Sequence, residues 1–124
     1  MINEKRLLDT FFDYVMIDSE TKNEKAMGEK LVEDLKVLGL EVKTDKAGEG
    51  FGSNGFNVCA YLPGTIPGDP TIMCAHMDTV TPGNGIRPLV DDGIIHTSPF
   101  FSICVKKLRY ARTGVFSCLQ LNVS

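Results

Sequence analysis

Residues 71–83 decide how this chain is interpreted, and they read Thr71-Ile72-Met73-Cys74-Ala75-His76-Met77-Asp78-Thr79-Val80-Thr81-Pro82-Gly83. The first part of this stretch is apolar and predicts a buried strand, which ends in a His-x-Asp motif and a loop. Because side chains alternate along a strand, we expect His76 and Asp78 on one face and Met77 on the other. A neutral imidazole there can bind zinc, and a carboxylate two residues later can hold its second nitrogen. The same pair is also common at the polar end of an ordinary strand.

Two amphipathic helices are predicted before this stretch. From Asn3 to Ile17, apolar residues recur every three or four positions, with Asn3 as a suitable N-cap and Glu4 in the first turn. A second helical pattern runs from Glu24 to Leu38 and ends at Gly39. Its buried face is expected to contain four apolar residues, Met27, Leu31, Leu35 and Leu38.

Strands are predicted after the helices. Residues 40–44 alternate apolar and polar side chains, as a half-buried strand does, whereas residues 56–62 and 71–76 are apolar enough for buried strands. The connection from Ala60 to Thr71 is too short for a helical crossover, so these two strands are expected to pair antiparallel. The order of elements predicts an α/β fold, with two N-terminal helices and a mixed sheet.

Two loops could be mistaken for ligand sites. Glycines at positions 48, 50, 52 and 55 lack the Lys-Ser/Thr ending of a phosphate-binding loop, so we interpret them as a flexible turn before a strand. Asp91-Asp92-Gly93 lies between the extended runs Ile86–Val90 and Ile94–His96 and predicts a hairpin turn rather than a metal site. His96 also ends a short apolar run, but no second motif residue accompanies it as Asp78 accompanies His76.

Composition excludes several classes of protein. Apolar residues make up 43% of the 124-residue chain and the net charge is -3, which fits one small globular domain and gives no electrostatic argument for binding nucleic acid. No apolar stretch approaches the roughly 20 residues that span a bilayer, and the N-terminus lacks the apolar core of a signal peptide. We therefore expect no membrane partner and a cytoplasmic location. The cysteines are far apart and are expected to pack as buried thiols: Cys59, Cys74, Cys104 and Cys118.

The composition changes after Thr97. Residues 1–97 contain all 16 acidic groups and nine basic groups, whereas residues 98–124 contain four basic groups and no acidic one. The two parts therefore have net charges of -7 and +4. Residues 98–124 could be a basic interaction tail, or the product of a shifted reading frame or aberrant ending, and the second interpretation is favoured.

Residues 3–97 resemble the N-terminal part of the M20 metallopeptidases, in particular their peptidase T-like branch of tripeptide and dipeptide hydrolases. The resemblance is carried by four stretches, Phe12–Thr21, Leu35–Val42, Ala75–Ile86 and Leu89–Thr97, and the third is the most specific. It implies that residues 1–97 are part of a three-layer α/β/α catalytic domain, with 98–124 outside the family pattern.

The resemblance also implies a chemistry. In the complete family site, two zinc ions activate water and polarise the scissile carbonyl of a short peptide. His76 would bind one zinc, and Asp78 would be the catalytic residue that supports this ligand. The family's bridging aspartate belongs to a Gly-x-Asp-Asp-Lys segment shortly after Thr97, where this chain has Ser98-Pro99-Phe100-Phe101.

The bridging aspartate and general base therefore cannot be assigned, and the chain alone is expected to hold at most one zinc weakly and to be inactive. An alternative function is a non-catalytic interaction module that docks through the basic tail. A partial sheet would also leave an exposed edge, which a homo-oligomer could cover.

Overall fold

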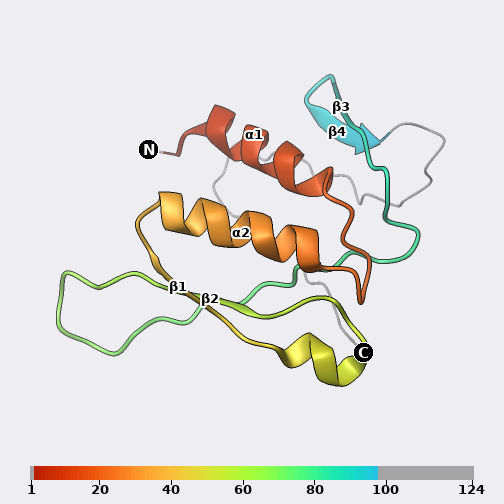
Figure 1. The fold of residues 1–124 in the computed structure, drawn as a ribbon. Coiled ribbons are helices and arrows are strands. Elements are labelled where there is room, and N and C mark those ends of the chain that lie inside the picture. The colour runs from red at the N-terminus through yellow and green to blue at the C-terminus, as the bar shows by residue number, and fades with distance from the viewer. Residues whose placement is uncertain (1, 98–124) are drawn as a thin grey trace.

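Residues 2–97 are described by a computed structural model, and they form a small mixed α/β fold (Figure 1). The elements, in chain order, are α1 (Glu4–Val15), α2 (Lys25–Val37), β1 (Glu41–Thr44), the 3-10 helix η1 (Ala47–Phe51), β2 (Val58–Tyr61), β3 (Pro88–Asp91) and β4 (Ile94–Thr97). The predicted α/β class and both N-terminal helices are confirmed. The strands form two antiparallel pairs, β1 with β2 and β3 with β4.

The ends of the two helices follow their sequence signals. Asn3 precedes α1 in an extended conformation, and its side-chain oxygen accepts a hydrogen bond from the Arg6 backbone N–H at 3.0 Å. This contact satisfies one of the free N–H groups of the first turn. At the C-terminal end of α2, Gly39 has a φ of +82°, a backbone conformation that costs glycine little.

A polar contact connects α1 with α2, which lie side by side in Figure 1. The Tyr14 hydroxyl donates a hydrogen bond to Asp34 Oδ2 at 2.9 Å, and Lys30 Nζ donates to Asp34 Oδ1 at 2.6 Å. The hydrogen bond from Lys30 lowers the pKa of Asp34. Burial, reinforced by the Asp34 carboxylate, raises the pKa of Tyr14 to about 12.

The sheet of β1 and β2 packs on α2. A glycine makes part of this packing possible, because a Cβ at position 28 would lie 3.0 Å from Cζ of Phe56. That separation is shorter than an ordinary contact between carbon atoms, so the bare backbone of Gly28 lets the Phe56 ring approach the helix. The pair of strands is in register with Val42 opposite Ala60, and Val42 is half-buried.

The prediction of a buried strand at residues 71–76 was wrong. These residues have no regular secondary structure and are exposed, with Ile72 at 82% and Met73 at 92%. The expected antiparallel partner, residues 56–62, pairs instead through β2 with β1. An apolar run indicates that its side chains prefer burial, but it does not indicate whether a partner strand or a covering layer is present. No other described part of the chain supplies that cover.

Some predictions of burial were also wrong. Leu38 is exposed, because α2 ends at Val37 and Leu38 follows it as the C-cap. Cys59 and Cys74 are free and exposed, so neither packs as a buried thiol. The apolar residues that are buried within residues 2–97 are Met27 and Ile86, at 8% and 7% exposure. The predictions about Cys104, Cys118 and the tail at 98–124 lie outside the described residues.

The hairpin predicted around Asp91-Asp92-Gly93 is confirmed. Asp91 pairs with Ile94 at the end of the ladder, which leaves Asp92 and Gly93 as the two-residue loop. Both have positive φ, +46° and +72°, as the common tight hairpin turn requires. Among the helices of the described segment, none is both long and apolar enough to cross a membrane.

Candidate functional site

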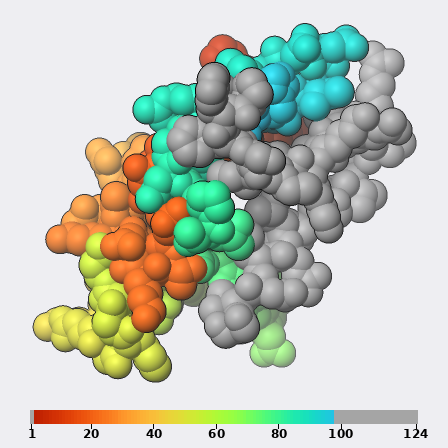
Figure 2. All heavy atoms as spheres, turned by 90° about the vertical axis from the view of Figure 1, so that its right-hand side faces the viewer, coloured from red at the N-terminus to blue at the C-terminus, as the bar shows by residue number. Residues whose placement is uncertain are grey.

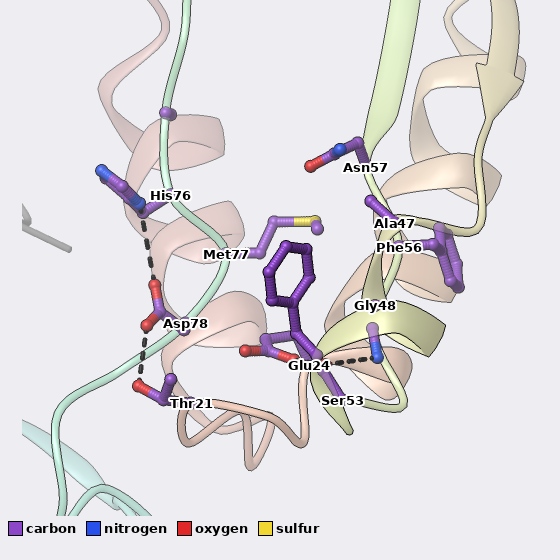
Figure 3. Close-up of a pocket in the computed structure, with 13 residues that line it drawn as sticks. Thr21, Glu24, Ala47, Gly48, Ser53, Phe56, Asn57, His76, Met77 and Asp78 are labelled. Carbon is purple, nitrogen blue, oxygen red and sulfur yellow. Dashed lines mark hydrogen bonds and ion pairs between the residues drawn. The ribbon is translucent and has the colours of Figure 1, made fainter. Parts of the chain in front are cut away.

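His76 and Asp78 lie together on one wall of a surface hollow of about 360 Å³ (Figure 3). His76 Nδ1 is 3.8 Å from Asp78 Oδ1, which is close enough for an electrostatic contact but too long for a hydrogen bond. The side chain of His76 is 41% exposed and that of Asp78 is 18% exposed. Met77 points away from both and toward the opposite wall, so the alternation expected from the sequence holds although the strand is absent.

The Asp78 carboxylate has a different neighbour on each oxygen. Thr21 Oγ1 donates a hydrogen bond to Asp78 Oδ2 at 2.8 Å, while Oδ1 is the oxygen nearest to His76. Figure 3 shows the three side chains in a row along one side of the hollow. One oxygen of the carboxylate is therefore held by a neutral hydroxyl, and the other is left for the imidazole.

The backbone around this row is held by residues 18–21, which we name the 18–21 segment. Three hydrogen bonds join it to the loop after Asp78: Thr79 N to Ser19 O (2.8 Å), Gly83 N to Glu20 Oε1 (2.6 Å) and Gly85 N to Asp18 Oδ1 (2.6 Å). Glu20 and Thr79 also form a parallel bridge, and Ser19 is completely buried. In Figure 2 the orange atoms that follow α1 lie against the turquoise atoms that precede β3.

The sequence did not identify this contact. The residues between α1 and α2 carry a run of hydrogen-bonding side chains, which is a possible signal of such a contact. What the sequence could not show was their partner, because Thr21 and Asp78 are 57 positions apart.

The opposite wall contains Glu24, whose carboxylate is occupied by structural contacts. It accepts hydrogen bonds from Ser53 Oγ at 2.7 Å and from the Lys22 backbone N–H at 2.6 Å. Burial acts to raise the pKa of Glu24, but these hydrogen bonds outweigh it and the pKa is lowered. Ser53 Oγ in turn accepts a hydrogen bond from Gly55 N at 2.9 Å. Glu24 is therefore an ionised anchor for the glycine-rich loop.

The loop at residues 48–55 is more ordered than the sequence predicted. It includes most of η1, and its chain doubles back so closely that a Cβ at Gly48 would lie 2.1 Å from the Gly55 carbonyl oxygen. Glycine is required there by the close approach of two backbone segments. The geometry supports the prediction of a turn and offers no argument for a phosphate site.

The side chains at the hollow could supply one ligand of a metal site. Within residues 2–97, no three His, Cys, Asp or Glu side chains lie close enough together to hold an ion. A structural or catalytic zinc takes at least three protein ligands, and His76 supplies one. His96 lies exposed on β4, and Asp91 and Asp92 lie at the hairpin, so none of these lines the hollow.

By fold, the described residues correspond to a fragment of a peptidase T-like peptidase domain. The solved structures that show this are a tripeptidase from Staphylococcus aureus subsp. aureus Mu50, with a TM-score of 0.74, and the aminopeptidase PepT from Bacillus cereus, with a TM-score of 0.72. Each is 41% identical to this chain; the matches cover 78% and 77% of it, and 26% of each solved chain.

Sequence comparison gives the same extent of similarity. The chain is 42% identical over 97 residues to the uncharacterized protein YqjE of Bacillus subtilis (strain 168), which covers 78% of this chain and 26% of that protein. No protein-family model matches the chain. The chain thus spans about a quarter of the length of the relatives it matches. The solved structures among these relatives are peptidases.

Proposed function

We propose that this chain carries the first metal-ligand motif of an M20-type, peptidase T-like zinc peptidase, with His76 as a zinc ligand and Asp78 as its supporting carboxylate. The observation that supports this most directly is the placement of Asp78 Oδ1 beside His76 Nδ1, at 3.8 Å, on the wall of an open hollow. The 41% identity to two solved peptidases supports the peptidase part of the proposal.

The two residues have separate roles in this proposal. Because Asp78 faces Nδ1 of His76, it favours a ring with its proton on that nitrogen and leaves Nε2 free to bind a metal. When bound in a complete site, zinc supplies an activated water and polarises the scissile carbonyl. The substrates we propose are short peptides, in keeping with the tripeptidase and aminopeptidase among the similar structures.

The proposal predicts little activity for the 124 residues alone. One imidazole cannot satisfy a zinc ion that takes four ligands, so we expect at most one weakly held zinc and no hydrolysis of a tripeptide. The cytoplasmic location and possible homo-oligomer remain predictions from the sequence.

The test is zinc binding by the purified chain, measured by competition with a chromophoric chelator. Cys59 and Cys74 are free and exposed, so the thiols are alkylated first, because thiolates also bind zinc. We expect H76A to weaken binding at least tenfold and H96A, the matched control at an exposed histidine of β4, to leave it unchanged. Equal binding by both variants would refute the assignment of His76. Zinc-dependent release of an amino acid from a tripeptide by this chain would refute the predicted inactivity.

A further inference from the structure

We infer that Thr21 is a positioning residue for His76 and that it acts through the carboxylate of Asp78. The inference deepens the proposed function, because it names a residue that prepares the ligand for its metal. Its first consequence, however, concerns which ring nitrogen of His76 carries the proton in the metal-free chain. It can therefore be tested even if zinc never binds.

The first step is the contact between the hydroxyl and the carboxylate. Thr21 Oγ1 donates to Asp78 Oδ2 at 2.8 Å, a good distance for an O–H···O hydrogen bond. The terminal torsion of an aspartate has a broad, two-fold preference, so a free carboxylate turns easily. A hydrogen bond on one oxygen fixes this torsion and with it the direction of Oδ1 toward His76.

The second step is the transfer of this orientation to the ring. Asp78 Oδ1 and His76 Nδ1 are 3.8 Å apart, so a shortening of about 1 Å would produce a charge-assisted hydrogen bond. Attraction to the carboxylate favours the proton on Nδ1, which leaves Nε2 with its lone pair directed elsewhere. A metal ligand needs this tautomer when it binds through Nε2.

The third step is that the position of Thr21 does not depend on its own hydroxyl. Its neighbours fix the backbone: Thr79 N donates to Ser19 O at 2.8 Å, and Asn23 N donates to Glu20 O at 2.7 Å. Glu20 and Thr79 form a bridge, and Ser19 is fully buried. Removing the hydroxyl should therefore release Asp78 while the 18–21 segment stays in place.

The expected size of the effect follows from exposure. Thr21 is exposed, so water can partly replace its hydroxyl when that group is removed. Outer groups that directly hold a metal-binding histidine are typically worth about 10- to 100-fold in affinity, and Thr21 acts one contact further out. We therefore expect a change of roughly three- to tenfold for Thr21.

The decisive experiment uses the metal-free chain at about pH 8.5, where an ordinary imidazole is neutral. The tautomer of His76 is measured from its ring ¹⁵N shifts and couplings in the wild type, T21V and T21S. We expect an excess of the Nδ1–H form in the wild type and in T21S, and a roughly three- to tenfold fall in its ratio to the Nε2–H form in T21V. T65V, which changes an exposed threonine in the loop after β2, is the matched control.

If Thr21 had a merely structural role, its replacement would disturb the fold around it as well as the His76 tautomer. The amide resonances of Thr79 and Gly83 and the thermal midpoint should stay close to those of the wild type in T21V, and T21A serves if T21V does not fold. An unchanged tautomer ratio in the folded variant would overturn the inference. So would an equal change in T21S, because that variant keeps the hydroxyl.

Zinc affinity provides the second readout, in the chelator competition described above. T21V should bind zinc roughly three- to tenfold more weakly than the wild type, and T21S should restore the affinity. If the wild type binds no zinc, the proposed function fails, but the tautomer ratio still decides whether Thr21 positions His76. If zinc binds and T21V alters neither readout, only this inference fails.

Discussion

At the scale of single residues, Tyr14 couples the packing of α1 and α2 to pH. Its hydroxyl donates to Asp34, and burial together with this carboxylate raises its pKa to about 12. The neutral form is therefore favoured in the folded chain more than in the unfolded chain, where the pKa is about 10. The resulting stabilisation is complete below pH 10 and is lost as the pH rises from about 10 to about 12.

The first prediction is that Y14F destabilises the chain by about 1 kcal/mol at neutral pH, the usual net contribution of one hydrogen bond. Asp34 keeps its contact with Lys30 in the variant, so its charge is not left without a partner. The variant should also lose less stability than the wild type between pH 7 and about pH 11. Urea unfolding at both pH values measures this, and Y61F at an exposed tyrosine is the control. Parallel pH dependence in Y14F and the wild type would contradict the coupling.

Residues also show how far the sequence could predict the site. The pairing of His76 with Asp78 followed from their spacing, because alternate side chains along an extended segment share a face. Thr21 could not be found in this way, since its contact with Asp78 is a consequence of tertiary structure. Spacing predicts neighbours within one element, and it says nothing about which distant segment lies beside it.

At the scale of elements, the β3–β4 hairpin depends on its two-residue turn. Asp92 and Gly93 have φ of +46° and +72°, and a side chain at the second position makes this left-handed conformation costly. Aspartate tolerates it better than most residues, because its short polar side chain can form local hydrogen bonds. The sequence Asp-Gly thus specifies both the turn and the register of the strands.

The second prediction is that G93A weakens this hairpin by about 1 kcal/mol, which corresponds to a roughly fivefold increase in the opening of its hydrogen bonds. Amide hydrogen exchange in β3 and β4 measures the opening directly. G50A is the matched control, because Gly50 does not have a positive φ and a Cβ there would meet nothing within 4 Å. Equal exchange in the two variants would show that the turn does not limit the hairpin.

The elements with local signals were predicted well. Both helices have apolar periodicity and recognisable ends, and the hairpin has its turn residues, so their existence followed from short stretches of sequence. Residues 71–76 have an equally clear apolar signal but no partner strand in the described chain. A strand is completed by hydrogen bonds to a neighbour, which its own composition cannot supply.

At the scale of the whole molecule, few apolar side chains within residues 2–97 are buried and several large ones are exposed. Met27 and Ile86 are buried within residues 2–97, whereas Tyr61, Leu62, Ile72 and Met73 are exposed on and after β2. The solved relatives are about four times as long as the part that this chain matches. Exposed apolar surface of this kind favours association with other surfaces.

The third prediction is that the chain self-associates through this surface and that the double variant I72K/M73K reduces the association at least tenfold. Burying one such side chain contributes about 1.5–3 kcal/mol. Replacing two of them with lysines should therefore weaken self-association by more than a factor of ten. Sedimentation velocity over a range of concentrations measures the change. V37K, at an 81% exposed position on α2, is the control. The same reduction in V37K would indicate a general effect of charge.

The contact of Thr21 with Asp78 also has a consequence for the order of folding. It closes a loop of 57 positions, whereas each helix and the β3–β4 hairpin can form from residues close together in the chain. Closing a long loop has an entropic cost that local contacts do not carry, so contacts of this kind generally form late. We therefore expect His76 and Asp78 to reach their positions after the helices have formed. An imidazole in its native orientation would then report that the two distant segments, residues 18–21 and the loop after Asp78, have come together.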